Sequence, residues 1–317
     1  MLLTMAALLI YTGLSITYVY AFRGDARWGT FKEYSRKAWP IFAPLNCLLY
    51  AFTTKRGQKA YPDVEDFSEL DSIHANWEVI RDEAQALLDT GYFEKTTDTE
   101  SGSYYDVGFR TFFKYGWSKF YLKWYGYTHE SGKRLCPKTV ALLQDIPMVK
   151  GAMFALLPAR SELTRHSDPI AVSLRYHLGL ITPNSDDCYI NVDGKRNAWR
   201  DGVAFIFDET YPHFVENNTD ERRLILMCDI ARPTHTLGRV FHFFYERLAG
   251  LTVVPNLEGD KRGFANRVFS SLAPTLARAK ALKTTNLSLY KALKLLVNGS
   301  LILILLLIIS GIVSLFT

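Results

Sequence analysis

Two histidines and an aspartate in the second half of the chain have the residue types of a metal site. His166 and Asp168 stand two residues apart, so on an extended strand both side chains point to the same side. His213 follows the strand-like run VAFIFD and the turn ETYP. Two imidazoles and one carboxylate on neighbouring strands form the facial triad that binds non-haem Fe(II) and leaves coordination positions open. An HxD tripeptide is also common by chance, so a surface turn stabilised by Asp168 is the alternative.

Three further side chains on the predicted strands suggest what such a metal site would bind. Arg175 and His177 share one face of the strand SLRYHLGL, and Arg223 lies on a later strand. Arginine is rarely buried without a partner, and its guanidinium pairs with carboxylates in a bidentate fork. Two such cations beside a metal predict an anionic co-substrate such as a dicarboxylate. Arg222 would face the opposite way from Arg223, and periodicity alone does not choose between them.

These residues fall in a region with the pattern of short strands. From residue 151 onward, apolar runs such as GAMFALLP, AVSLRYHLGLI and RRLILMCDI alternate with turn signals that include Asp193-Gly194 and Asp201-Gly202. Short runs with regular punctuation are typical of antiparallel hairpins, and hence of a β-sandwich or jelly roll. Apolar residues at helical spacing predict a helix over residues 71–90, and a second one follows Cys136-Pro137. We expect these helices to cover one of the sheets.

The composition fits a folded domain and excludes several classes of protein. Of the 317 residues, 48% are hydrophobic and 22% are charged, which excludes a disordered chain. The 37 basic and 32 acidic residues give a net charge of +5, which is unlike a dedicated nucleic-acid binder, and no protein partner is indicated. The four cysteines are scattered without a CxxC pair, which argues against a disulfide scaffold and a cysteine-based zinc site.

Both ends of the chain are far more apolar than the middle. Residues 1–22 and 295–317 carry no charge, and each run has the roughly 20 residues that a helix needs to cross a ~30 Å hydrocarbon core. Both runs are therefore interpreted as transmembrane helices. The cations follow the first run, beginning with Arg23 and Arg27, so we interpret it as an uncleaved anchor rather than a signal peptide. With basic residues beside both runs, residues 23–294 are predicted to be cytoplasmic.

The segments between the apolar ends and the strands give the remaining boundaries. Residues 38–52 (AWPIFAPLNCLLYAF) are too short and too broken by proline to span, so we expect an interfacial membrane segment. Residues 236–251 alternate apolar and basic positions, which fits either contact with a membrane surface or an ordinary amphipathic helix. The main domain is placed at 60–255 with its β core at 150–233, followed by a basic juxtamembrane helical region at 256–294.

Residues 109–127 are dense in aromatic residues interleaved with basic ones. The stretch fits a grip on a ligand with an anionic head and an apolar tail, or else a strand and a helix that supply aromatic side chains to the core. On the first interpretation, four basic residues are candidates for binding lipid phosphates: Arg110, Lys114, Lys119 and Arg165.

The stretch HSDPIAVSLRYHLGLITP, followed by CYINVDGKRNAWRDGVAFIFDETYPHFVENNTDERRLILMCDIARP, resembles the aspartyl/asparaginyl β-hydroxylase family. The resemblance includes the turn before His213 and the closing D-x-x-R-P. It implies a dioxygenase that depends on Fe(II), with 2-oxoglutarate and O2 as co-substrates. The expected fold class is therefore mainly β with flanking helices. It comprises a double-stranded β-helix (jelly roll) catalytic domain with N- and C-terminal transmembrane helices.

The resemblance also implies roles for individual residues. His166 and His213 match the iron-binding histidines, and Arg223 matches the arginine that binds the distal carboxylate of 2-oxoglutarate. Arg175 matches a second arginine of that pocket, and His177 falls at the position of another pocket histidine. The vertebrate protein hydroxylase has a glycine where this chain has Asp168, so this chain can offer a full triad.

Over its whole length, including the apolar ends and segments such as NWEVIRDEA and FYLKWYG, the chain is most similar to the bacterial lipid A hydroxylase branch of that family. This implies hydroxylation of carbon 2 of a fatty acyl chain of lipid A at the cytoplasmic face of the bacterial inner membrane, with the lipid and the bilayer as partners. Hydroxylation of an ornithine lipid, or of Asp or Asn in a protein, is the alternative. A non-catalytic jelly-roll binding module is a third interpretation.

Overall fold

The computed structural model describes residues 2–98, 101–109 and 116–296. The chain divides into two compact units, residues 1–266 and residues 267–317, and each is described by itself. The strands named below all belong to the first unit.

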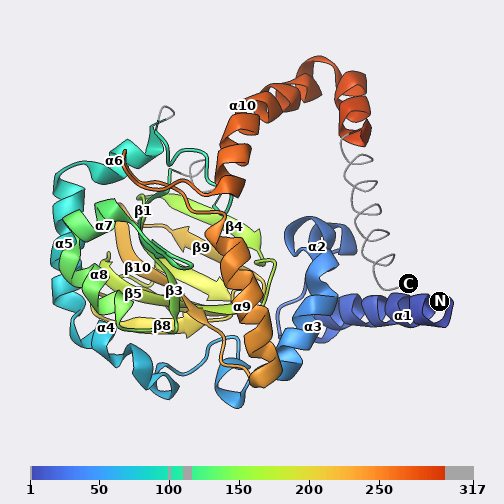
Figure 1. The fold of residues 1–317 in the computed structure, drawn as a ribbon, viewed down its shortest axis with the longest axis horizontal. Coiled ribbons are helices and arrows are strands. Elements are labelled where there is room, and N and C mark those ends of the chain that lie inside the picture. Colours follow the sequence, from blue (N-terminus) through green and yellow to red (C-terminus); the bar gives the residue numbers. More distant parts are fainter. Residues whose placement is uncertain (1, 99–100, 110–115, 297–317) are drawn as a thin grey trace. The chain divides into compact units, whose positions relative to one another are not determined.

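Two antiparallel sheets form the centre of the first unit (Figure 1). The larger sheet has the strand order β2-β1-β3-β10-β5-β8, and the smaller has the order β4-β9-β6-β7. The strands of the larger sheet are β1 (Ser118–Trp124), β2 (Tyr127–Thr128), β3 (Val149–Leu157), β5 (Ser173–Ile181), β8 (Ala204–Phe207) and β10 (Arg223–Ala231). Those of the smaller sheet are β4 (Ser161–His166), β6 (Cys188–Val192), β7 (Lys195–Ala198) and β9 (His213–Asn217).

The alternation of side chains along the strands sorts residues between two cores. One core joins the larger sheet to the helices and takes Leu174 and Tyr176 of β5. The other core lies between the two sheets, and Ile225 of β10 packs there with Val215 of β9. Successive side chains of a strand point to opposite faces. Arg175 and His177 therefore point into the space between the sheets, and Arg223 does so from β10.

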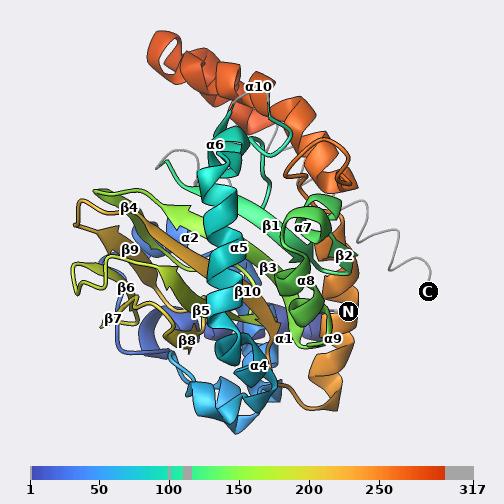
Figure 2. The same cartoon turned by 90° about the vertical axis from the view of Figure 1, so that its left-hand side faces the viewer.

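Helices cover the outer face of the larger sheet, as expected, and Figure 2 shows α5 lying across it. The sequence predicted one helix over residues 71–90, whereas the chain forms α4 (Asp71–Ala75) and α5 (Trp77–Asp89), which are separated by the non-helical Asn76. The predicted helix after Cys136 begins at Pro137 as α8 (Pro137–Gln144). The neighbouring helices are α6 (Tyr92–Thr97) and α7 (Glu130–Leu135).

The hairpin between β6 and β7 turns at Asp193-Gly194, one of the predicted turns. Both residues have positive φ, 54° and 85°, which a two-residue hairpin of type I′ requires. The Asp193 carboxylate also accepts hydrogen bonds from the backbone N–H groups of Asp25 and Ala26, at 2.8–2.9 Å. The hairpin therefore holds the chain just after the N-terminal helix.

The N-terminal segment packs on the rest of the first unit. Its elements are α1 (Leu2–Thr17), the π-helical turn Tyr18–Phe22, α2 (Phe31–Lys37) and α3 (Ala43–Phe52). The Tyr11 hydroxyl of α1 donates to the Pro44 carbonyl, and Asn46 of α3 bonds the backbone of Pro169 and Ala171. Helix α9 (Thr236–Gly250) contacts α3. Short 3₁₀ turns connect the segment, at Pro40–Phe42, Lys55–Gly57, Val64–Asp66 and Ser68–Leu70. Residues 38–52 thus pack partly into the domain, with Leu49 fully buried.

The prediction of transmembrane helices is wrong. None of the helices within the described residues is both long enough and apolar enough to cross a membrane. Helix α1 has 16 residues before it changes to a π-helical turn. At 1.5 Å per residue that is about 24 Å, short of a ~30 Å hydrocarbon core. The predicted location at the bacterial inner membrane depended on these spans, and the same finding overturns it. In the predicted span 295–317, residues 297–317 lie outside the described part of the chain.

The second unit is described up to residue 296. Helix α10 (Phe264–Thr285) begins at the end of the first unit and continues into the second. It accounts for much of the helical region predicted at 256–294.

Candidate metal centre

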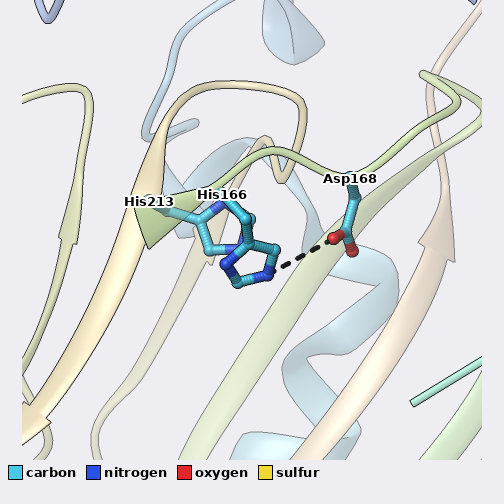
Figure 3. Close-up of side chains that lie close together, drawn as sticks. All are labelled: His166, Asp168 and His213. Carbon is cyan, nitrogen blue, oxygen red and sulfur yellow. Dashed lines mark ion pairs between the residues drawn. The ribbon is translucent and has the colours of Figure 1, made fainter. Parts of the chain in front are cut away.

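His166, Asp168 and His213, here called the triad, come together at the ends of two paired strands. His166 is the last residue of β4 and His213 the first of β9, and the ladder between these strands pairs them directly. Their ring centroids are 4.3 Å apart, and His166 Nε2 lies 3.6 Å from Asp168 Oδ1. One ligand atom from each residue lies within 4.8 Å of the other two. Figure 3 shows the Asp168 carboxylate pointing toward the two rings.

The second ring nitrogen of each histidine is held by the backbone. His166 Nδ1 lies 2.8 Å from the Thr164 carbonyl oxygen, and His213 Nδ1 lies 3.0 Å from that of Tyr211. A carbonyl oxygen only accepts, so both Nδ1 atoms must donate. Each Nε2 then keeps its lone pair for a metal, which is the usual way in which a neighbouring hydrogen bond sets the tautomer of a ligating histidine.

The burial of the two histidines differs. His213 is 5% exposed, whereas the His166 and Asp168 side chains are each somewhat under one third exposed. Burial, together with the neighbouring His166, lowers the pKa of His213 well below its ordinary value. His213 is therefore neutral near pH 7, the form in which imidazole coordinates metals. The partly exposed side of the triad leaves an approach for other ligands.

Arg175 lies at the centre of a buried charge cluster, which comprises Arg175, Asp168, Glu209 and Asp229. Its Nη2 lies 3.2 Å from Asp168 Oδ2 and also pairs with Glu209, and its Nε lies 3.0 Å from Asp229 Oδ1. Burial alone would lower the pKa of Arg175, but Asp229, Glu209 and Asp168 raise it above its ordinary value. The sequence assigned Arg175 to a co-substrate carboxylate. In the structure its guanidinium is engaged by three carboxylates of the chain.

The charge cluster holds more carboxylates than cations. Burial raises the pKa of Glu209 to about 7 and that of Asp229 to about 6, although Arg175 opposes both shifts. Asp168 therefore shares Arg175 with Glu209 and Asp229, two carboxyl groups whose raised pKa values favour their protonated forms. One carboxylate oxygen of Asp168 faces His166 while the other pairs with Arg175, so Arg175 fixes the orientation of this triad residue.

Arg223 is buried and forms no ion pair with any carboxylate that the structure describes. It is 0% exposed, and its three guanidinium nitrogens have no hydrogen-bond partner among the described residues. Its Cζ atom lies 4.3 Å from the Trp199 ring and 5.1 Å from the Trp117 ring. Burial lowers the pKa of Arg223 to about 10, so it remains a cation at neutral pH. The neighbouring Arg222 is exposed, which settles the choice that periodicity left open. An unpaired buried guanidinium is costly unless an anion binds it.

His177 lies between Arg223 and the triad in a chain of ring contacts. Its ring contacts Phe207, which in turn contacts His213, and Trp199 Nε1 donates to His177 Nδ1 at 3.3 Å. Burial, with Arg223 as the next cause, lowers the pKa of His177 well below its ordinary value. The neutral ring therefore carries its proton on Nε2, and this buried N–H has no partner in the described part of the chain.

The donor set fits Fe(II) and 2-oxoglutarate. The triad offers two imidazole nitrogens and one carboxylate oxygen, which is the donor set of non-haem Fe(II) oxygenases. Within the described ranges, Arg223 and the Nε2–H of His177 are donors without a partner in the space between the sheets, where a dicarboxylate would accept hydrogen bonds from both. We call Arg223 and His177, with the two tryptophans beside Arg223, the co-substrate pocket.

Of the four residues suggested for lipid phosphates, the structure describes Lys119 and Arg165, which lie in different surroundings. Lys119 is buried and pairs with Asp106 at 2.6 Å, so its charge is already used. Arg165 lies beside the triad, over the Trp28 ring, and donates to the Arg27 carbonyl. Arg110 and Lys114 lie outside the described residues.

Of Glu209 and Asp229, the sequence interpretation named only Glu209, as a turn carboxylate in the first place and as a group that orients the site in the second. In the structure Glu209 accepts a hydrogen bond from Ser173 as well as from Arg175. Asp229 lies at an even spacing from Arg223 on β10, which places both on the inner face. This periodicity was the available signal, because a carboxylate on the same face as two arginines predicts an ion pair.

Comparison with known proteins gives the chain a family. The profile of the family described as Aspartyl/Asparaginyl beta-hydroxylase matches residues 74–233, half of the chain, including the triad and the co-substrate pocket. The ornithine lipid ester-linked acyl 2-hydroxylase of Rhizobium tropici is 36% identical over 137 residues, which is 43% of this chain and 49% of that protein. The human aspartyl/asparaginyl beta-hydroxylase is 29% identical over 185 residues, 55% of this chain and 23% of that protein.

The chain thus spans about half or less of the length of these curated relatives. Among solved structures, a Pseudomonas putida prolyl-4-hydroxylase is similar over 37% of this chain and 72% of its own, with 19% identity and a TM-score of 0.27. A likeness this partial carries no argument about function.

Proposed function

The chain belongs to the aspartyl/asparaginyl β-hydroxylase family, and on that premise we propose that it is an Fe(II)- and 2-oxoglutarate-dependent dioxygenase that hydroxylates carbon 2 of an acyl chain of a polar lipid. The observation that carries the proposal is that the domain which holds the triad also holds Arg223, a buried arginine without a hydrogen-bond partner among the described residues. A structural metal site would be closed by its protein ligands and would have no use for that arginine.

The triad would hold the iron through His166 Nε2, His213 Nε2 and a carboxylate oxygen of Asp168. Backbone carbonyls orient both rings, and Arg175 orients the carboxylate, so binding requires little rearrangement. Arg223 would bind the distal carboxylate of 2-oxoglutarate, and the Nε2–H of His177 would donate to the same molecule. The rings of Phe207 and Trp199 exclude water from this side.

When bound, ferrous iron with 2-oxoglutarate and O2 supplies the oxidising power for hydroxylation, and succinate and CO2 are the other products. The protein's contribution is position and a dry environment. The buried charge of Arg223 matches one carboxylate of the co-substrate, and the neutral His213 and His177 place no further cation in the pocket.

A lipid substrate is supported by the ornithine lipid acyl 2-hydroxylase of Rhizobium tropici, which is 36% identical in the matched region. Within this class, we propose the acyl chains of lipid A as the first substrate to test and ornithine lipid as the second. Asp or Asn in a protein is the second candidate function, because the human relative that carries that name matches 185 residues of the chain.

The test is a comparison of three substrates with one purified protein. The full chain is incubated with Fe(II), 2-oxoglutarate and O2, together with lipid A, with ornithine lipid, or with a peptide that contains Asp and Asn. We expect a lipid to gain the mass of one oxygen atom, fragmentation to place that oxygen on acyl carbon 2, and succinate to form in equal amount.

His213→Ala is the control and should abolish both products. A mass gain on the peptide alone would replace the lipid function by the protein function. Equal succinate from the parent protein and from His213→Ala would refute the enzyme proposal.

A further inference from the structure

A cavity of about 670 Å³ lies between α1, α3 and the loop that connects β8 to β9. This N-terminal cavity is within the roughly 300–1,000 Å³ range of small-molecule sites. Its floor and rim differ in chemistry. The buried residues Arg23, Asp208 and Arg232 form a charged floor, whereas Leu14 of α1 and Tyr18 at the rim are about half exposed or more. The cavity therefore suits an amphiphile that enters with its polar end first.

Arg23 is built into the floor as a preorganised cation. Its Cζ atom lies 4.0 Å from the Tyr50 ring centroid and 3.5 Å from that of Tyr211, so aromatic rings cover the guanidinium. Arg23 Nη2 donates a hydrogen bond to Asp208 Oδ2 at 2.7 Å. Within the described ranges, Nε and Nη1 of Arg23 have no hydrogen-bond partner. Burial alone would lower the pKa of Arg23, but Tyr50 and Asp208 raise it, so the group stays charged.

The floor carries an excess of positive charge. Asp208 lies between two arginines, at 2.7 Å from Arg23 and 2.8 Å from Arg232. Arg232 is otherwise satisfied, because its guanidinium donates to the carbonyls of Ala171, Gly57 and Ser173. One carboxylate thus faces two cations, and the free donors belong to Arg23. Such a floor favours an anionic group, to which guanidinium donates charge-assisted hydrogen bonds.

The cavity and the triad share one wall, the loop between β8 and β9. Asp208 and Tyr211 face the cavity. The carbonyl of Glu209, between them, accepts from the backbone N–H of Asp168 at 2.8 Å, and the Tyr211 carbonyl accepts from His213 Nδ1. Carbon 2 of an ester-linked acyl chain is adjacent to its carbonyl and so lies close to the lipid headgroup. A headgroup site must therefore lie near the metal, as this cavity does.

We propose that the N-terminal cavity binds the headgroup of the lipid substrate. Arg23 binds a phosphate or carboxylate of the headgroup, and the apolar part of the lipid extends out of the cavity past Leu14 and Tyr18. The inference rests on the proposed lipid function, which names the substrate class. It adds the residue that recognises the anion.

The test measures binding and needs no turnover. Calorimetry on the full chain compares the binding of octyl phosphate, inorganic phosphate and octanol. Excess 2-oxoglutarate is present throughout, so that the phosphates do not bind at Arg223. We expect octyl phosphate to bind more tightly than either fragment. Arg23→Gln should weaken octyl phosphate roughly tenfold or more, the effect of losing a charge-assisted hydrogen bond. The control is Arg81→Gln on α5, which also removes one positive charge but at a side chain that is 36% exposed. It should leave the binding of octyl phosphate unchanged.

Because Arg23 is part of a buried ion pair, a second variant avoids the floor. Leu14→Glu places a negative charge at the rim on a side chain that is 64% exposed, and it should also weaken octyl phosphate. Its control is Leu9→Glu, which is 70% exposed on the same helix and does not line the cavity.

Two outcomes would overturn the inference. If inorganic phosphate bound as tightly as octyl phosphate, the site would serve a free anion instead of a lipid. If Arg23→Gln and Leu14→Glu both bound octyl phosphate as their controls do, the cavity would not be the site. Failure of the proposed function looks different, because lipids would remain unhydroxylated while octyl phosphate binding still depended on Arg23.

Discussion

Arg223 is a buried side chain whose three guanidinium nitrogens have no hydrogen-bond partner among the residues that the structure describes. Burial lowers its pKa from the ordinary value to about 10, which corresponds to a destabilisation of the ligand-free fold by about 3 kcal/mol. Arg223→Met keeps the length of the side chain and removes the charge. We expect the variant to melt at a higher temperature than the parent in the absence of ligands, and to lose at least tenfold in 2-oxoglutarate affinity.

Thermal denaturation and calorimetry with 2-oxoglutarate check both parts of this prediction. Arg222→Met, the exposed neighbour, is the control and should change neither quantity. A less stable Arg223→Met protein with unchanged 2-oxoglutarate affinity would show that Arg223 is structural.

Glu209 gives a prediction that depends on pH. Its folded pKa of about 7 lies above the ordinary 4.5, so the folded chain holds a proton that the unfolded chain releases. Its contribution to stability is present below pH 4.5 and is lost as the pH rises through about 7. Glu209→Gln mimics the protonated form. Above pH 7 we expect the metal-free variant to be more stable by on the order of 1–3 kcal/mol, with the difference vanishing near pH 4.5.

Melting temperatures across that range, with a chelator present, measure the effect. A variant that is less stable than the parent above pH 7 would mean that the charge of Glu209 is needed to hold Arg175.

At this scale residue types and the even spacing of His166 and Asp168 pointed to the triad, whereas the choice of Arg223 over Arg222 came from the family resemblance. The sequence did not supply the partners of Arg175. Glu209 and Asp229 lie on segments that meet Arg175 only once β8, β10 and β5 are paired, and ladder pairing is a long-range property.

Among the elements, the connection after the N-terminal helix is tightly fitted. Gly24 has a φ of +76°, and a Cβ there would lie 2.4 Å from Asp193 Oδ1 and 2.8 Å from the Tyr211 ring. Gly24→Ala should therefore release residues 23–27 from the β6–β7 hairpin. We expect faster limited proteolysis in this segment and a stability loss of at least about 1 kcal/mol.

The control for this prediction is Gly126→Ala. Gly126 also has positive φ, +84°, but nothing lies within 4 Å of the position that a Cβ would take there. The difference between the two variants isolates the steric contact from the backbone strain. Equal losses of stability in both, with no change in proteolysis at residues 23–27, would contradict the fit.

The strands and the Asp193-Gly194 hairpin were predictable because turn residues and alternation determine them locally. The single helix predicted over residues 71–90 is two helices in the structure, because apolar spacing continues across Asn76 although the backbone there leaves the helical region. The cavity was not predictable, since it exists only where α1, α3 and the β8–β9 loop meet.

The whole molecule divides after Asn266 into two compact units. The triad, the co-substrate pocket and the N-terminal cavity all lie in the first unit. We expect a chain that ends at Asn266 to keep the melting temperature of the full chain within about 2 °C, because a loss of 1 kcal/mol would shift a domain of this size by about that much. Thermal denaturation of the two proteins checks this, and a lower melting temperature of the shortened chain would mean that the second unit supports the first.

The interpretation of residues 1–22 as a transmembrane helix failed at this scale. Counting uncharged residues measures how apolar a run is, but not whether a helix continues through it or packs on the fold. Helix α1 ends at Thr17 and bonds α3 through Tyr11, which the composition does not reveal.

The two tryptophans that flank Arg223 have a practical consequence. Indole emission responds to nearby charge, and Trp199 and Trp117 lie 4.3 and 5.1 Å from the guanidinium carbon. Neutralisation of that cation by an arriving dianion changes the electric field at both rings. If the chain binds 2-oxoglutarate as proposed, indole fluorescence would therefore report its entry in a stopped-flow fluorimeter without any label.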